Sequence, residues 1–221
     1  MIYHNKYRIE PNRWQNWDYS AQGGYFITMC ISDREAILGK IIDGKMYLSE
    51  YGEIVRNEFI QMGTYNKRAT VDEWVIMPNH VHCIIILGAI DDGDVEKIHD
   101  GDVEKIHEFS LQPPAPFLPI SSSQHPTDID IKQYRRIRRK MLIPLLEGKF
   151  KTLTSKQINL LRKTPGRETW QHDYYDHVIR NDHEHDRIQQ YIIYNPAKWQ
   201  DDTFNSENGS KCNDDGEGLW Y

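Results

Sequence analysis

Two strand-like runs meet at a short turn in TVDEWVIMPNHVHCIIIL, which extends from Thr70 to Leu87. β-Branched and aromatic residues are frequent in both runs, and the Pro78-Asn79 pair between them is typical of a turn. Strands joined by so short a connection pair antiparallel. The segment therefore predicts two neighbouring strands, at 70–77 and 80–87, in an antiparallel sheet.

The second of these strands begins with His80-Val81-His82. Side chains two positions apart on a strand project from the same face, so the two imidazoles can converge on one metal ion. The same spacing recurs in His183-Glu184-His185, but within a predicted helix, where residues two apart differ by about 200° in direction. We therefore treat His80 and His82 as candidate metal ligands; the alternative is two partly buried polar residues on a sheet.

The remaining pattern alternates strands and helices. Strands are predicted at 25–33 and 170–179, a hairpin around Asp-Gly at 41–48, and helices from Ser49 to Met62, at 131–142, at 155–162 and from Asp182 to Asn195. Asn181 provides the start signal of the last helix and Pro196 its end.

One face of this last helix carries Ile188, Tyr191, Ile192 and Asn195, at positions i, i+3, i+4 and i+7. The isoleucines need a packing surface, and the strand face that bears the two histidines needs a cover. Docking one on the other would bring Tyr191 inward as a phenol beside the metal and Asn195 as an oxygen ligand. The alternative is an ordinary amphipathic helix with a tyrosine in the core.

A divalent ion and a phenol together suggest a reaction at phosphorus. A phenol is a weak nucleophile, with a pKa near 10, but it can attack a phosphodiester that a metal ion polarises. The ion also stabilises the departing 3′ oxygen. The product is a covalent phosphotyrosine, which conserves the energy of the phosphodiester bond and permits rejoining.

Charge is distributed unevenly along the chain. The net charge is −6, yet 132–167 holds twelve Lys or Arg against one acid, Glu147, so the remainder carries −17. A segregated basic stripe is typical of a polyanion-binding surface, although a solvated helix face would also account for it. The candidate nucleic-acid-binding residues are Lys132, Arg135, Arg136, Arg138, Arg139, Lys140, Lys149 and Lys151.

Length and composition exclude several classes of protein. The 221 residues suit one domain, and no apolar run approaches the roughly 20 residues of a membrane helix. The start of the chain lacks an apolar signal core, and three widely spaced cysteines argue against a disulfide framework or a zinc finger. We expect a cytoplasmic protein.

An eight-residue sequence is repeated without change at 92–99 and 100–107, followed by a Pro- and Ser-rich run. This pattern predicts a mobile loop, at about 88–130, inserted into a domain of residues 1–202. The polar, Gly- and Asp-rich residues 203–221 are expected to form a disordered tail.

Three blocks, at 77–85, 170–181 and 187–199, resemble the REP-associated tyrosine transposases, a branch of the HUH single-tyrosine transposases. The resemblance spans about residues 20–200. It implies an α+β fold, ferredoxin-like or RRM-like, with helices packed on an antiparallel sheet. It also implies nicking and joining of single-stranded DNA at hairpin-forming repeats with Mg²⁺ or Mn²⁺, by a nucleoid-associated homodimer or monomer.

The same resemblance assigns roles to four residues. The metal ligands map onto His80, His82 and Asn195, and the nucleophile maps onto Tyr191, whereas Tyr194 lies off the apolar stripe.

Three other readings compete with a transposase. A histidine-triad nucleotide hydrolase would need a third alternating histidine at position 84, which is Ile84. A relaxase or replication initiator uses the same chemistry, but the short chain lacks a helicase-like segment. A hairpin DNA- or RNA-binding module without cleavage activity stays open.

Overall fold

The computed structural model describes residues 2–3, 6–7, 17–89 and 136–205. The chain forms two compact units, one made of Met1–Ala89 with Arg138–Tyr221 and the other of Ile90–Ile137. The expected inserted loop from residue 90 onward and the expected tail from residue 206 onward lie outside the described residues. Among the helices that are described, none is long and apolar enough to cross a membrane.

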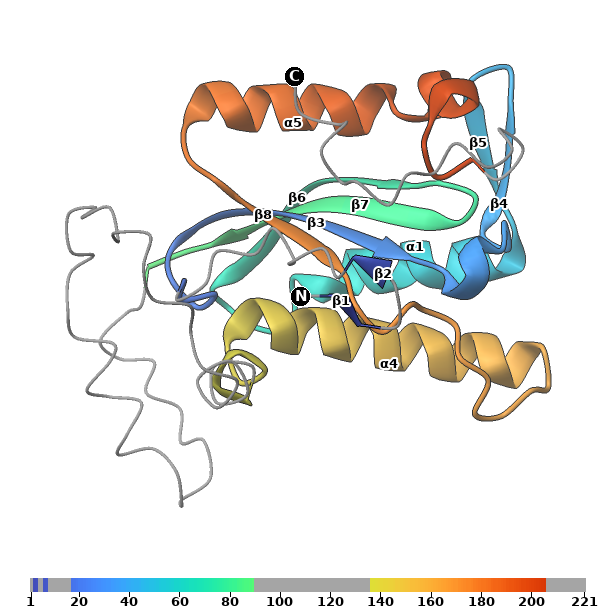
Figure 1. Ribbon diagram of the computed structural model, residues 1–221, viewed down its shortest axis with the longest axis horizontal. Helices are drawn as coiled ribbons and strands as arrows, with labels where there is room; N and C mark the ends of the chain where they lie inside the picture. The colour runs from blue at the N-terminus through green and yellow to red at the C-terminus, as the bar shows by residue number, and fades with distance from the viewer. Residues whose placement is uncertain (1, 4–5, 8–16, 90–135, 206–221) are drawn as a thin grey trace. The chain divides into compact units, whose positions relative to one another are not determined.

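A four-stranded sheet forms the centre of the first unit (Figure 1). Its strands are β3 (Gly23–Cys30), β6 (Ala69–Ile76), β7 (His80–Leu87) and β8 (Tyr175–Ile179). They lie in the order β6-β7-β3-β8, and every neighbouring pair is antiparallel. The two strands predicted around Pro78-Asn79 are therefore adjacent, as their short connection requires.

The helices that pack on the sheet in the described part of the chain are α1 (Glu50–Met62), α4 (Leu142–Leu161) and α5 (Asp182–Tyr194). The chain runs β3-α1-β6-β7-α4-β8, a ferredoxin-like β-α-β-β-α-β order, and α5 follows the last strand. This confirms the α+β fold with helices packed on an antiparallel sheet.

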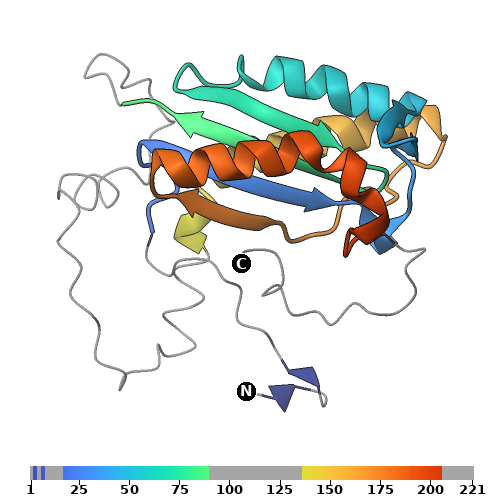
Figure 2. The same ribbon diagram turned by 90° about the horizontal axis from the view of Figure 1, so that it is seen from above.

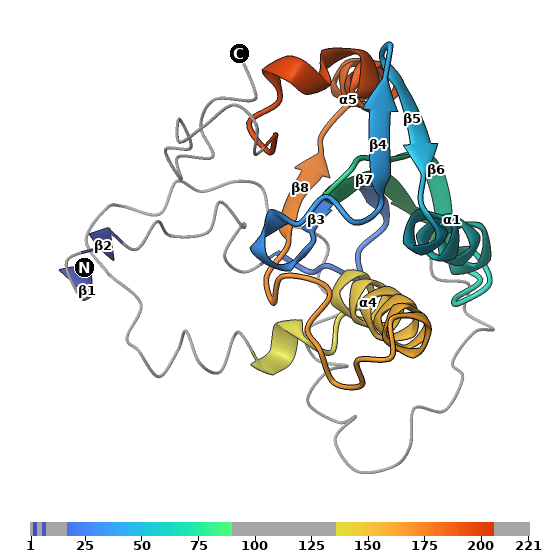
Figure 3. The ribbon, with the colours of Figure 1, turned by 90° about the vertical axis from the view of Figure 1, so that its right-hand side faces the viewer.

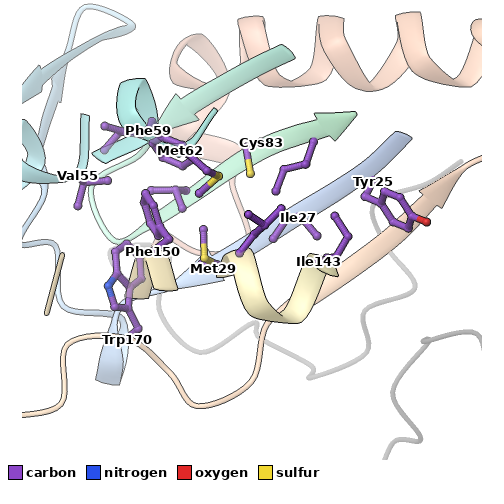
Figure 4. Close-up of a cluster of buried hydrophobic side chains, with 14 of the residues drawn as sticks. Tyr25, Ile27, Met29, Val55, Phe59, Met62, Cys83, Ile143, Phe150 and Trp170 are labelled. Carbon is purple, nitrogen blue, oxygen red and sulfur yellow. The ribbon is translucent and has the colours of Figure 1, made fainter. Parts of the chain in front are cut away.

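The helices cover opposite faces of the sheet (Figure 3). On one face α1 and α4 enclose the larger core, in which Phe59 and Phe150 meet with ring centroids 4.6 Å apart (Figure 4). On the other face α5 lies over the sheet, roughly along the strands (Figure 2), and buries Ile188 and Ile192 against Phe26 and Ile84. Alternation along the strands assigns each residue to one of these two layers.

The described part of the chain also contains smaller elements. They are β1 (Ile2–Tyr3), β2 (Lys6–Tyr7), η1 (Ser32–Arg34), β4 (Gly39–Ile42), β5 (Lys45–Leu48) and η2 (Pro196–Asp201). β4 and β5 form the predicted hairpin, and its turn has positive φ at both Asp43 and Gly44, as a type I′ hairpin turn requires. A side chain at Gly44 would come within 3.3 Å of Ala197 in η2, so the hairpin tip packs closely on the segment after α5.

The helix start signals act as predicted. Ser49 Oγ accepts a hydrogen bond from the backbone N–H of Gly52 at 3.1 Å, and Asn181 Oδ1 accepts one from Glu184 at 2.9 Å. Each bond satisfies a donor that the first helical turn leaves without a backbone partner.

The helix predicted at 155–162 is part of a longer one, because α4 is continuous over 142–161. Of the helix predicted at 131–142, residues 136–138 are helical, and 131–135 lie outside the described residues. Pro144 is compatible with α4 because it is the third residue of the helix, where its missing N–H would have no helical acceptor. Ile143, Leu146, Phe150 and Ile158 lie buried along one side of α4 and hold it on the sheet.

The last strand is shorter than predicted. β8 begins at Tyr175, five residues after Trp170, which forms only an isolated bridge to Ile31. The Trp170 indole instead donates to Thr154 Oγ1 of α4 at 2.8 Å, and its ring joins the larger core. Packing, not strand pairing, holds this end of the predicted segment.

Candidate active site

The two histidines of β7 meet on the face that α5 covers. His80 Nε2 and His82 Nε2 are 3.1 Å apart, and both side chains are fully buried. β7 pairs with β3 without a register shift, so strand alternation places both imidazoles on one face, which is the arrangement that the sequence predicted. Two ring nitrogens that converge in this way suit a shared metal ion.

Each imidazole has a buried partner at its other nitrogen. Thr28 Oγ1 lies 2.7 Å from His82 Nδ1, because Thr28 and His82 are directly paired across β3 and β7. Asn79 Oδ1 lies 2.9 Å from His80 Nδ1. Partners of this kind orient histidine ligands in metal sites.

Burial keeps both imidazoles uncharged. It lowers the pKa of His80 well below the ordinary value, and the nearby His82 and Arg34 lower it further. Burial alone lowers the pKa of His82 to about 3. Both rings are therefore neutral at physiological pH, and the neutral imidazole is the form that binds a metal ion.

Helix α5 brings Tyr191 to the same place. Its hydroxyl lies 3.3 Å from His82 Nε2, and its ring packs edge-on against Phe26 with centroids 6.1 Å apart. Burial raises the pKa of the Tyr191 phenol well above its ordinary value, and the Asp202 carboxylate raises it further, while a hydrogen bond with Asn195 opposes both. Ionisation of this phenol therefore needs a positive charge or a base close by.

Asn195 ends α5 and is 3% exposed. Its side chain is hydrogen-bonded to Tyr191, yet its Oδ1 atom is buried without a hydrogen-bond partner. An amide oxygen left unsatisfied in this way costs free energy unless an ion or a water binds it. The predicted stripe thus places Tyr191 beside His82 and Asn195 beside Tyr191.

The donor set fits a divalent cation. Two neutral imidazole nitrogens and one amide oxygen are acceptable ligands for Mn²⁺ and similar ions, and the unsatisfied Asn195 Oδ1 is the atom that most needs one. Within the described part of the chain, no three His, Cys, Asp or Glu side chains are grouped so as to hold a metal ion. The candidate third ligand remains the amide oxygen of Asn195.

The segment after α5 also belongs to the site, which sequence reasoning missed. The Phe204 ring lies 4.5 Å from that of His80, centroid to centroid, and Asp202 Oδ2 lies 3.9 Å from His80 Nε2. Burial raises the pKa of Asp202. The polar composition that predicted a tail from residue 203 conceals this packing, and the fold continues through Asn205, which is buried.

Three other sequence candidates lie elsewhere. Tyr194 is 55% exposed on the outer side of α5. His183 is also exposed, and His185 contacts Asp72 Oδ2 at 2.8 Å. As their helical spacing predicts, these two histidines do not converge.

The basic residues divide into two groups. Arg138 and Lys151 are used internally: Arg138 donates to the Tyr174 hydroxyl at 3.0 Å and lies 3.6 Å from Asp176, and Lys151 pairs with Glu147. The exposed ones are Arg136, Arg139, Lys140 and Lys149. Lys132 and Arg135 lie outside the described residues.

Comparisons with known proteins give relatives of low identity. No family model matches the sequence. The chain is 26% identical over 190 residues to an uncharacterised protein of Haemophilus influenzae (strain ATCC 51907 / DSM 11121 / KW20 / Rd). The aligned region covers 86% of this chain and 89% of that protein.

Solved structures similar to this chain include two transposase-related proteins. One is a REP-associated tyrosine transposase bound to a REP hairpin (TM-score 0.42, 18% identity, 86% of this chain and 73% of that one). The other is a protein of Deinococcus radiodurans R1 provisionally named a transposase (TM-score 0.39, 14% identity, 82% and 96%). Likenesses this distant say nothing about the chemistry of this chain, so its function is inferred from the residues of the site.

Proposed function

We propose that this protein is a metal-dependent, single-stranded DNA endonuclease and transposase of the REP-associated tyrosine type. Tyr191 is its nucleophile, and His80, His82 and Asn195 are its metal ligands. The observation that carries the proposal is the 3.3 Å separation between the Tyr191 hydroxyl and His82 Nε2, beside a second imidazole nitrogen 3.1 Å away.

The bound ion, Mg²⁺ or Mn²⁺, would polarise the scissile phosphate and stabilise the departing oxygen. The Tyr191 oxygen forms a bond to phosphorus while the bond from phosphorus to the 3′ oxygen breaks. The phenol loses its proton and the released 3′ oxygen gains one, so one phosphodiester replaces another. The reverse exchange rejoins a strand, which is what transposition needs.

The raised pKa of the Tyr191 phenol is consistent with this use of a metal ion. Burial and Asp202 both disfavour the phenolate in the metal-free protein. A divalent cation beside His82 would favour it, because opposite charges attract strongly where water is excluded. Docking of α5 holds the Tyr191 ring in place, which reduces the entropic cost of attack.

The exposed basic residues supply the contacts to DNA in this proposal. Arg139 and Lys140 lie just before α4 with side chains open to solvent. Cations there neutralise phosphates without reading bases. The choice of hairpin-forming repeats as substrate follows from the resemblance of the three sequence blocks to the transposase family.

The test is formation of a covalent adduct. Labelled hairpin DNA with a single-stranded flank is incubated with the protein and Mn²⁺, and SDS-stable protein–DNA species are measured. We expect an adduct that EDTA abolishes, that Tyr191→Phe lacks and that Tyr194→Phe, the matched control on the exposed side of α5, retains. Persistence of the adduct in Tyr191→Phe would reject this nucleophile.

A second candidate function is hairpin binding without cleavage. The observation that favours it is the complete burial of His80, which packs against Phe204, and of His82, so that a phosphate cannot approach either imidazole from solvent. This alternative predicts retained hairpin binding and no adduct at any concentration of Mn²⁺. The same assay therefore separates the two functions.

A further inference from the structure

Asn79 occupies the turn between β6 and β7 and is 1% exposed. The turn is closed by a hydrogen bond from the Met77 N–H to the His80 carbonyl at 2.8 Å. The Asn79 carbonyl accepts a further bond from the Ile31 N–H at 2.8 Å. The backbone at Asn79 is therefore held from two sides, and its side chain has little freedom to turn.

The side-chain amide of Asn79 has one orientation that satisfies its neighbours. Its Nδ2 atom lies 2.7 Å from the Phe204 carbonyl oxygen and 3.2 Å from the Arg34 carbonyl oxygen. Carbonyl oxygens only accept hydrogen bonds, so the atom between them must be the NH₂ group, which donates to both. A flipped amide would oppose its oxygen to two carbonyl oxygens.

This orientation turns Asn79 Oδ1 toward His80 Nδ1, 2.9 Å away. An amide oxygen only accepts, so Nδ1 must carry the hydrogen of the neutral ring. The other nitrogen, Nε2, then keeps a bare lone pair, and it points toward His82 Nε2 at 3.1 Å. That is the nitrogen and the state in which an imidazole binds a metal ion.

We propose that Asn79 is a positioning residue: its amide, anchored on two distant carbonyls, holds His80 in the tautomer that presents Nε2 to the metal site. The role rests on the proposed metal-dependent function, although the tautomer itself exists without metal. It also connects His80 to the segment after α5, since one of the anchoring carbonyls belongs to Phe204.

The first test needs no variant of Asn79. In metal-free protein with ¹⁵N-labelled histidine, long-range ¹H–¹⁵N correlation spectra report which nitrogen of each ring is protonated, and the signals that His80→Gln removes identify His80. We expect a protonated Nδ1 and a bare Nε2. A His80 ring protonated at Nε2 in the wild type would overturn the proposal.

The second test measures Mn²⁺ affinity by titration calorimetry. Loss of a partner that orients a ligand commonly costs about 10–100-fold in metal affinity, and we expect that loss in Asn79→Ala, together with mixed His80 tautomers in the NMR spectrum. The control is Asn159→Ala, on the helix α4 that covers the opposite face of the sheet from the histidines; it removes a bond from Asn159 Nδ2 to the Arg167 carbonyl. It should bind Mn²⁺ like the wild type.

The outcomes distinguish this inference from the proposed function. If the wild type binds Mn²⁺ and a folded Asn79→Ala binds it equally well, Asn79 has no positioning role and the proposed function stands. If the wild type binds no Mn²⁺, the metal-dependent function fails, and the tautomer spectra decide the role of Asn79. If Asn79→Ala does not fold, the wild-type spectrum decides in the same way.

Discussion

Tyr191 Oη lies 3.3 Å from His82 Nε2, although the two residues are 109 positions apart in the chain. His82 owes its place to the register of β7 against β3, and Tyr191 owes its place to the docking of α5. Neither element contains the site alone. The separation of phenol and imidazole is thus set by the packing of a helix on a sheet.

Removing a docking side chain should destabilise the protein and disturb the site. Ile188 lies on the face of α5 that packs on the sheet and is fully buried there, so Ile188→Ala should lower the free energy of unfolding by about 2–5 kcal/mol. Urea denaturation measures the change. Ile193→Ala, on the exposed side of the same helix, should stay within about 0.5 kcal/mol of the wild type. Equal losses in both variants would contradict this account of docking.

Thr28→Val should weaken metal binding with little change in shape. The substitution keeps a β-branched side chain but removes the hydroxyl that lies 2.7 Å from His82 Nδ1. Without it His82 loses the partner that orients its ring, and Mn²⁺ affinity should fall about 10–100-fold in calorimetry. Thr152→Val removes a hydroxyl that bonds within α4, so its Mn²⁺ affinity should match that of the wild type.

Stability of the metal-free protein should fall as the pH is lowered from 6.5 toward 5. An unfolded imidazole takes up a proton near pH 6.5, whereas burial holds the pKa of His82 at about 3 in the folded state. The unfolded state then binds more protons, so stability is complete above pH 6.5 and declines below it by up to about 1.4 kcal/mol per pH unit for this histidine.

His82→Gln should remove that part of the pH dependence, measured by urea denaturation in EDTA at several pH values. The exposed His183 provides the control, because His183→Gln leaves the buried imidazoles unchanged. A wild-type slope that His82→Gln leaves intact would show that another group dominates acid destabilisation.

Replacing Arg138 should lower stability, whereas replacing the adjacent Arg139 and Lys140 should weaken only DNA binding. Arg138 is largely buried beside Asp176, and Arg138→Ala should cost about 3 kcal/mol of stability because a buried carboxylate loses its cation. Arg139 and Lys140 are exposed, so their joint replacement by alanine should leave the melting temperature unchanged. It should reduce the salt dependence of single-stranded DNA binding, lowering the log–log slope by about 1.4. DNA binding with an unaltered salt slope would remove this pair from the interface.

Local pattern was enough to place much of this site. Alternation along a strand puts His80 and His82 on one face, and a stripe of helical spacing puts Tyr191 and Asn195 on another. The apolar face of the helix then packs on the apolar strand face that carries the two histidines. Each of these inferences depends on the geometry of one element, which neighbouring residues determine.

Contacts between distant segments were beyond that reasoning. The sequence around Asn79 reads as a turn, and nothing in it names the carbonyls of Arg34 and Phe204 as partners. Likewise Arg138 looks like one cation among several until Tyr174 and Asp176 are found beside it. Hydrophobicity and periodicity describe which face of an element is buried, but the partner of a buried polar atom depends on how separate elements pack. In this protein, the local sequence determines which strand residues share a face and which helix residues form one stripe. The orientation and burial of the His80 imidazole are decided only by tertiary structure, because they depend on contacts among the β6–β7 turn, η1 and the segment after α5.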